Sequence, residues 1–364
     1  MSNRAALVAV ITALMVGVLA SLALRPASRE VVDRGHPAAL APIRWRLPTA
    51  FGTNLPALGD NVLYLSERIA ALTDGRFRAE VFEPGEVVPA FSIVDAVRDA
   101  KVQAGYTWLG YDQGKLPASV LFGAVPFGME PWEYAAWWHE AGGRELAEDI
   151  YAELGVHPVL CGLIGPETAG WFRHPIESTQ DLEGLKIRFA GLGGKVIQNL
   201  GASVTMMPGG EIFQALERGA IDATEFSLPV VDERLGFDRI AQINYFPGWH
   251  QPFTAFHLAV GDAAWAALDP AARAVVETAC TAATLRNLAR AEALQGAVLR
   301  GFESKGVSAR SLPESVLTDL ERASELLLAK EAAADPDFAR VLASQRAFSA
   351  DYNLWRRIAY PRGR

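Results

Sequence analysis

Short segments in which apolar and polar residues alternate recur along the chain, and this period of two is typical of strands with one buried face. The clearest is residues 184–191, GLKIRFAG, in which three apolar residues alternate with Lys186, Arg188 and Ala190. Further segments with strand character are residues 43–50, 76–82 and 104–111. Arg188 lies where its strand would end, just before a cluster of glycines. From the residues alone, a solvated arginine at a strand edge is the simpler interpretation.

Segments with apolar residues three and four positions apart lie between these strands, as expected of amphipathic helices. Residues 58–75 and 91–103 have this spacing, and a second run of strands and helices covers residues 175–226. From about Ala263 to residue 306 the chain is strongly helical, with one long helix or two. The alternation predicts an α/β fold of two lobes with largely parallel sheets, a helical C-terminal third, and ligand sites at strand ends.

The N-terminus differs from the rest of the chain. Arg4 precedes twenty uncharged residues, 5–24, which is typical of a secretory signal but is also long enough to span a bilayer. Small residues would allow cleavage after Ala23 or after Ala20, and an uncleaved anchor stays open as an alternative. Each outcome places the following residues outside the cytoplasmic membrane, in the periplasm. Residues 25–42 lack periodicity and are interpreted as a linker.

Composition and charge narrow the classes of function. The chain has 364 residues, 50% of them hydrophobic and 21% charged, which suits a globular protein with two domains. The formal net charge is −8 and no long basic stretch occurs, so a nucleic-acid partner is not expected. The two cysteines, Cys161 and Cys280, are too few for a disulfide scaffold. They either pair with each other or remain as two buried thiols.

Several enzyme signatures are absent from the sequence. His139 and Glu140 lack the second histidine of a zinc protease helix, and no Gly-x-Ser-x-Gly elbow occurs. Residues 191–196, GLGGKV, have the wrong spacing for a phosphate-binding loop and indicate the start of a helix. The six histidines show no metal-ligand spacing.

One connected block carries a resemblance to a known family. GLKIRFAG, followed by LGASVTMMPGGEIFQALERGAIDATE at 200–225, resembles the signature region of the solute receptors of tripartite ATP-independent periplasmic (TRAP) transporters. Residues 123–162, AGWF at 169–172 and FPGWHQP at 246–252 are similar to a subgroup that binds small 2-oxo and 2-hydroxy acids. The resemblance extends from Ile43 to the C-terminus.

The resemblance implies a two-lobe periplasmic-binding-protein-like α/β fold, with a cleft between the lobes and long C-terminal helices. The expected division places a signal peptide or anchor at 1–24, a linker at 25–42, lobe I at 43–165 plus about 254–293, and lobe II at 166–253 plus about 294–364.

Arg188 acquires a specific role from this resemblance, because the family's arginine at this position holds the carboxylate of the substrate. A guanidinium offers two parallel N–H donors that match two carboxylate oxygens, and it stays charged when desolvated. Since a strand-end arginine that faces a cleft is not part of the core, we expect the fold to tolerate its loss.

A cation site is implied by residues on either side of Arg188. In the family, counterparts of Glu225, of the Phe226 backbone carbonyl and of Gln251 bind a metal ion, and these oxygen ligands suit Na⁺ or Ca²⁺. Glu167 departs from the family pattern, where the polar residue that contacts both ligand and cation is commonly glutamine. A second carboxylate would favour a divalent ion, or would pair with Arg188 and compete with the substrate.

Several side chains near these positions are expected to wall the substrate pocket. The aromatic ones are Tyr106, Trp108 and Trp171, and Asn54 in the loop after the first strand is a further expected contact. Aromatic walls exclude water and strengthen the arginine contact, although aromatic residues in such segments are more often core.

These observations predict a transport protein and not an enzyme. The expected role is an extracytoplasmic receptor that binds a small organic monocarboxylate with one cation, and passes it to the membrane subunits of a TRAP-type secondary transporter. It would be a monomer or a homodimer. Two alternatives stay open: a metal-dependent enzyme acting on a 2-oxo acid through Glu167 and Glu225, and a membrane-anchored carboxylate sensor.

Overall fold

The computed structural model describes residues 12–15 and 41–359, which fall into two compact units, Met1–Ala41 and Pro42–Arg364. Most of the predicted signal or anchor, apart from residues 12–15, and most of the linker lie outside the described residues. Among the residues that are described, no helix combines the length and the apolar character needed to cross a membrane. The following paragraphs concern the second unit alone.

Two small sheets form the first lobe, and they contain the three N-terminal strands expected from the sequence. β1 (Ile43–Pro48) pairs in parallel with β2 (Phe77–Phe82). The other sheet has the order β3-β10-β4, with β3 at Ala104–Thr107, β4 at Val156–Ile164 and β10 at Thr254–Gly261. The helices of this region are α2 (Asp60–Leu72), α3 (Ile93–Arg98), α4 (Pro131–Glu140), α5 (Gly143–Ala152) and α9 (Asp262–Ala266), with 3₁₀ turns at Ala90–Ser92, Leu109–Asp112 and Pro117–Phe122.

A six-stranded sheet forms the second lobe, with the order β11-β9-β5-β8-β6-β7. Its strands are β5 (Gly170–Phe172), β6 (Lys186–Arg188), β7 (Ser203–Thr205), β8 (Ala223–Thr224), β9 (Ile243–Phe246) and β11 (Ser308–Ser311). Its helices are α6 (Gly191–Asn199), α7 (Gly209–Glu217) and α8 (Pro229–Leu235), with 3₁₀ turns at Thr179–Leu182, Phe237–Arg239 and Glu303–Lys305. The glycine cluster therefore begins α6, as predicted.

The sheets are mixed, so the expectation of largely parallel sheets is only partly right. The pairs β11/β9, β8/β6 and β6/β7 are parallel, whereas β5 and β10 each run antiparallel to both neighbours. β5 follows β4 of the first lobe, and β10 follows β9 of the second. Each is the first strand that the chain forms after it crosses from one lobe to the other. Such a strand is not preceded by a helix of its own lobe, so it need not run parallel to its neighbours as in a repeated strand–helix unit.

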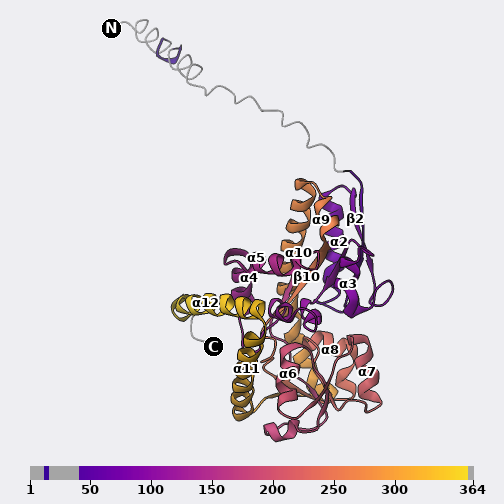
Figure 1. Ribbon diagram of the computed structural model, residues 1–364, viewed down its shortest axis with the longest axis vertical. Coiled ribbons are helices and arrows are strands. Elements are labelled where there is room, and N and C mark those ends of the chain that lie inside the picture. Colours follow the sequence, from indigo (N-terminus) through magenta and orange to yellow (C-terminus); the bar gives the residue numbers. More distant parts are fainter. Residues whose placement is uncertain (1–11, 16–40, 360–364) are drawn as a thin grey trace, which may run out of the picture. The chain divides into compact units, whose positions relative to one another are not determined.

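The C-terminal third is helical, with α10 (Pro270–Phe302), α11 (Glu314–Ala334) and α12 (Pro336–Ala359). α10 packs on α2 and β4 of the first lobe and on α8 of the second, and α11 packs on α6 (Figure 1). α12 packs on α11 and also on α4 and α5. Cys161 of β4 and Cys280 of α10 form a disulfide, which decides the question that the sequence left open.

Two crossing segments, residues 165–169 between β4 and β5 and residues 247–253 between β9 and β10, connect the sheets of the two lobes. They lie against each other, because the Glu167 N–H donates to the Gln251 carbonyl at 3.2 Å. Gly248 permits this approach, since a side chain there would collide with the backbone of Glu167. The crossing segments thus bring residues far apart in the sequence to one place.

Candidate functional site

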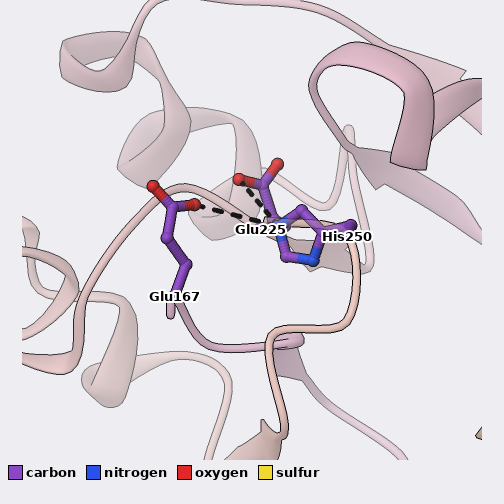
Figure 2. Close-up of side chains that lie close together, drawn as sticks. All are labelled: Glu167, Glu225 and His250. Atoms are coloured by element: carbon purple, nitrogen blue, oxygen red, sulfur yellow. Dashed lines mark ion pairs between the residues drawn. The ribbon is translucent and has the colours of Figure 1, made fainter. Parts of the chain in front are cut away.

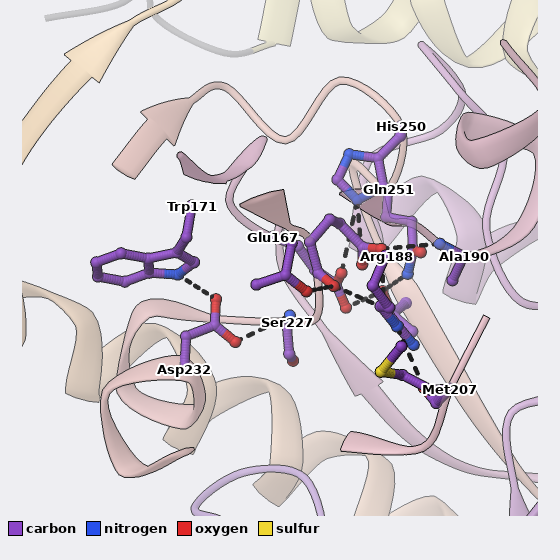
Figure 3. A network of polar contacts seen from close by, with 12 residues as sticks. Glu167, Trp171, Arg188, Ala190, Met207, Ser227, Asp232, His250 and Gln251 are labelled. Atoms are coloured by element: carbon purple, nitrogen blue, oxygen red, sulfur yellow. Dashed lines mark hydrogen bonds and ion pairs between the residues drawn. The ribbon is translucent and has the colours of Figure 1, made fainter. Parts of the chain in front are cut away.

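Arg188 ends β6 and is 1% exposed, so it is a core residue and does not face an open cleft as expected. Its Nη1 donates to the Glu225 carboxylate at 3.0 Å and to the Glu225 carbonyl at 2.7 Å, and Nε donates to the Met207 carbonyl at 3.3 Å (Figure 3). The guanidinium also lies 5.1 Å from the centre of the Phe226 ring. These hydrogen bonds, all to described residues, use Nη1 and Nε and not Nη2.

Glu225 directly follows β8, and its carboxylate is buried beside Arg188. Oε2 accepts hydrogen bonds from Arg188 and from the Ala190 N–H at 2.9 Å, whereas Oε1 accepts none from any described residue. Burial opposes ionisation of this carboxyl, but the charge of Arg188 outweighs it and, with His250 and the Ala190 N–H, lowers the pKa of Glu225 to about 2. Glu225 is therefore ionised, with one oxygen uncommitted.

Glu167 lies in the first crossing segment and is 3% exposed. Its Oε1 accepts from the Thr254 hydroxyl at 2.8 Å, and that hydroxyl accepts from Gln251 Nε2 at 2.7 Å. Burial raises the pKa of Glu167 to about 7, with a further contribution from Glu225 that His250 partly offsets. In this arrangement Glu167 does not pair with Arg188, so it does not compete with a substrate for the guanidinium.

His250 joins these residues, although the sequence gave no metal-ligand spacing for any histidine. Its imidazole is 1% exposed, and Nε2 lies 3.5 Å from Glu225 Oε1 and 3.8 Å from Glu167 Oε2 (Figure 2). Burial opposes the charged form of His250, but the two carboxylates outweigh it and raise its pKa. The signal available in the sequence was its position next to Gln251 in GWHQP.

A cavity borders this cluster, and its lining includes six of the predicted site residues: Trp108, Glu167, Arg188, Glu225, Phe226 and Gln251. Phe51, Tyr111 and Phe256 are the other aromatic residues of its wall. Trp108 and Tyr111 meet edge to face at 5.1 Å between ring centres. The cavity therefore has aromatic walls around one guanidinium and two carboxylates.

Three predicted contacts lie elsewhere. Trp171 is fully buried, donates its indole N–H to Asp232 at 2.8 Å (Figure 3), and packs on Phe302 of α10. Tyr106 is also fully buried, and its hydroxyl accepts from Asn61 at 3.0 Å. Asn54 lines a wider neighbouring cavity, which shares Phe51 and Phe226 with the first.

The arrangement is suited to binding a small anion beside a cation. Arg188 supplies a desolvated positive charge, and such charge-assisted hydrogen bonds contribute about 1.5–3 kcal/mol each. Glu225 Oε1 and Glu167 Oε2 are buried oxygens without hydrogen bonds from the described residues. Because buried polar atoms are nearly always paired, these two oxygens fit a bound cation. No described side chain near them forms a nucleophile–base pair of the serine or cysteine type.

Known proteins are similar to this chain over most of its length. The model of the bacterial extracellular solute-binding protein family 7 matches residues 53–335. A Nostoc protein named monocarboxylate 2-oxoacid-binding periplasmic protein is 35% identical over 322 residues, which cover 88% of each chain.

Two solved structures of TRAP transporter solute-binding proteins are also similar. One, from Bordetella bronchiseptica, is a dimer with calcium and picolinate; it has a TM-score of 0.86 and 33% identity, covering 88% of this chain and 95% of the other. Another, from Pseudoalteromonas atlantica, contains sodium and pyruvate; it has a TM-score of 0.84 and 32% identity, covering 87% and 97%. This chain, with its two-lobe fold, belongs to the family 7 of bacterial extracellular solute-binding proteins.

Proposed function

We propose that this protein is the extracytoplasmic receptor of a TRAP-type secondary transporter and that it binds a small 2-oxo or 2-hydroxy monocarboxylate together with one cation. The observation that carries the proposal is the buried Arg188, held by Glu225 and Met207 at the edge of an aromatic cavity. The relatives support the ligand class, since their names and contents include 2-oxo acids, pyruvate and picolinate.

Arg188 contacts the substrate carboxylate through Nη2 in this proposal. Nη1 and Nε already donate to Glu225 and Met207, which fixes the plane of the guanidinium before the ligand arrives. A donor held in advance loses little rotamer entropy on binding, and this increases affinity. Trp108 forms part of the cavity wall. Asn54 would contact only those ligands that extend into the wider cavity.

The cation lies between the acid and the uncommitted oxygens of Glu167 and Glu225. The Phe226 carbonyl is proposed as a further ligand. Gln251 is also proposed as a ligand, and its Nε2 donates to Thr254, which in turn orients Glu167. Na⁺ and Ca²⁺ are the ions that similar structures contain.

The location and partners follow from the proposed role. Export through the N-terminal segment places the receptor in the periplasm, where it meets the membrane subunits of the transporter. The lobe boundaries given from the sequence, and the choice between monomer and homodimer, remain predictions. Tyr106 and Trp171 act in this proposal as core residues that support the cavity.

A thermal-shift screen of small carboxylic acids, with and without chelator, tests this function. We expect 2-oxo or 2-hydroxy monocarboxylates to raise the melting temperature more than simple or dicarboxylic acids, and chelator to weaken the effect. Nuclear magnetic resonance of each acid during incubation distinguishes the receptor from the enzyme alternative, since a receptor leaves the acid unchanged. Absence of any shift across the series, or consumption of the acid, would contradict the proposal.

A further inference from the structure

Ser227 has a buried hydroxyl that the rest of the described chain does not use. The residue directly follows Phe226 and is 1% exposed. Its Oγ is buried and has no hydrogen-bond partner among the described residues. Buried hydroxyls are nearly always paired, because desolvation without a hydrogen bond is costly. The Ser227 hydroxyl therefore fits a partner outside the chain, such as a bound ligand.

The position of Ser227 points to the ligand cavity, because the residue belongs to the same wall as Arg188 and Glu225. Thr254 also lies in this wall and also has a hydroxyl. The Thr254 hydroxyl, however, donates to Glu167 at 2.8 Å. Unlike Thr254, Ser227 therefore keeps its hydroxyl available for a molecule in the cavity.

The backbone of Ser227 is held from two sides. Its N–H donates to one carboxylate oxygen of Asp232 at 3.1 Å, and the other oxygen of Asp232 accepts from the Trp171 indole at 2.8 Å (Figure 3). The Ser227 carbonyl accepts from the Thr168 N–H at 3.1 Å. A donor that is positioned in advance loses little entropy when a ligand contacts it. The fixed backbone thus presents the unpaired hydroxyl at a defined place.

The neighbours of Ser227 indicate which part of an acid it would meet. It follows Phe226, whose carbonyl is a proposed cation ligand, and it is bonded to Thr168, which follows Glu167. Ser227 therefore lies between two parts of the proposed cation site. An acid whose carboxylate contacts Arg188 would turn its 2-oxygen toward that cation. The 2-oxygen is accordingly the part that we expect beside Ser227.

We propose that the Ser227 hydroxyl forms a hydrogen bond with the 2-oxygen of the bound acid and makes the receptor selective for 2-oxo and 2-hydroxy acids. A hydroxyl can donate to a keto oxygen, and it can donate to or accept from another hydroxyl. Both classes of acid therefore satisfy it. An acid with a methylene group at carbon 2 leaves the hydroxyl buried and unpaired, and sites of this kind reject such analogues.

The inference deepens the proposed function, on which it rests for the presence of an acid at Arg188. The rival role of the hydroxyl is structural. A structural hydroxyl would contribute to the free energy of unfolding without ligand, whereas an unpaired buried hydroxyl contributes nothing or opposes folding. The two roles therefore predict different effects on the unliganded protein.

Ser227→Ala tests the inference, because it removes the hydroxyl and keeps both backbone hydrogen bonds. We expect calorimetric titration to give pyruvate binding that is weaker by about 2- to 12-fold, the effect of one hydrogen bond, and propionate binding that is little changed. The ratio of the two affinities should fall by the same factor. Unfolding of the unliganded variant should need the same or a higher urea concentration.

Thr168→Val is the matched control. Thr168 is fully buried and its hydroxyl also has no partner among the described residues, but it does not belong to the cavity wall. The control thus loses an unpaired buried hydroxyl at a neighbouring position. It should leave the ratio of pyruvate to propionate affinity unchanged.

Infrared spectroscopy of bound pyruvate, labelled with ¹³C at carbon 2, examines the contact itself. A hydrogen bond lowers the stretching frequency of a carbonyl group, so Ser227→Ala should raise the frequency of the labelled carbonyl and leave the carboxylate bands in place. An unchanged affinity ratio, or an unchanged carbonyl frequency, would overturn the inference and leave the proposed function intact. If no 2-oxo or 2-hydroxy acid binds the unaltered protein with any cation, the proposed function fails and the inference fails with it.

Discussion

Replacement of Arg188 should affect stability and ligand binding by separable amounts. The side chain is 1% exposed and makes three hydrogen bonds, two of them to Glu225. Arg188→Ala leaves the Glu225 carboxylate buried without its partner, and breaking a buried ion pair in this way costs about 3–5 kcal/mol of unfolding free energy. This differs from the expectation that the fold would tolerate the loss.

A second substitution separates the two roles. Glu225→Gln removes the buried charge that Arg188→Ala leaves behind, so the double variant should recover about 1–3 kcal/mol of stability relative to Arg188→Ala. Binding of the acid should not recover, because the guanidinium is still missing. Loss of a buried charge-assisted contact to the ligand costs about 2–5 kcal/mol, or about 30- to 5,000-fold in dissociation constant.

Arg188→Lys separates charge from geometry. An ammonium can pair with the Glu225 carboxylate, but it cannot also reach the Met207 carbonyl and a ligand in the planar arrangement of a guanidinium. The lysine variant should therefore regain part of the stability and little of the binding. Lys186→Ala, on the same strand but exposed, is the control. Urea unfolding and calorimetric titration measure both quantities, and full-strength binding by Arg188→Ala or Arg188→Lys would refute the reasoning.

Three further predictions concern other parts of the molecule. Burial raises the pKa of Asp112 to about 7. The folded protein therefore keeps a proton that the unfolded chain releases near pH 4. The contribution of Asp112 to the unfolding free energy accordingly falls by about 4 kcal/mol as the pH rises from 4 to 7. Asp112→Asn should accordingly be more stable than the unaltered protein at pH 8 and similar to it at pH 4. The same difference in unfolding free energy at both pH values would contradict this prediction. Cys161→Ser with Cys280→Ser should cost about 2–5 kcal/mol in urea unfolding, and an unchanged midpoint would argue against a stabilising disulfide. Trp355 and Ile358, 59% and 83% exposed at the end of α12, favour self-association; light scattering should give a dimer at micromolar concentration that Trp355→Glu weakens, whereas a monomer throughout would exclude it.

Periodicity identified much of the secondary structure, because burial of one face acts on each strand or helix locally. The strand that ends at Arg188 and the helix that begins at Gly191 both follow from the sequence alone. The pairing and direction of the strands could not be predicted from the sequence in the same way. β5 and β10 run antiparallel to their neighbours because the chain crosses between lobes, and no local pattern records a crossing.

Site residues could be predicted within the continuous segment, residues 184–225, that resembles a known family, and less well outside it. Arg188 and Glu225 lie in that segment, and the structure brings them together. His250 lies far along the chain from Glu167 and Glu225, so its spacing carried no signal. Trp171 shows a second limit, because a strand of three residues does not reveal which face will point to the cavity and which to Asp232.

Calorimetric titration of the purified protein with pyruvate and with propionate, in the presence of cation, tests the central claim most directly. The two acids have the same carboxylate, but only pyruvate has the 2-oxo oxygen that could contact the cation. We predict one pyruvate per chain, bound about 10- to 150-fold more tightly than propionate, which corresponds to one charge-assisted contact of about 1.5–3 kcal/mol. Equal affinity for the two acids, or no binding of either with any cation, would contradict the account.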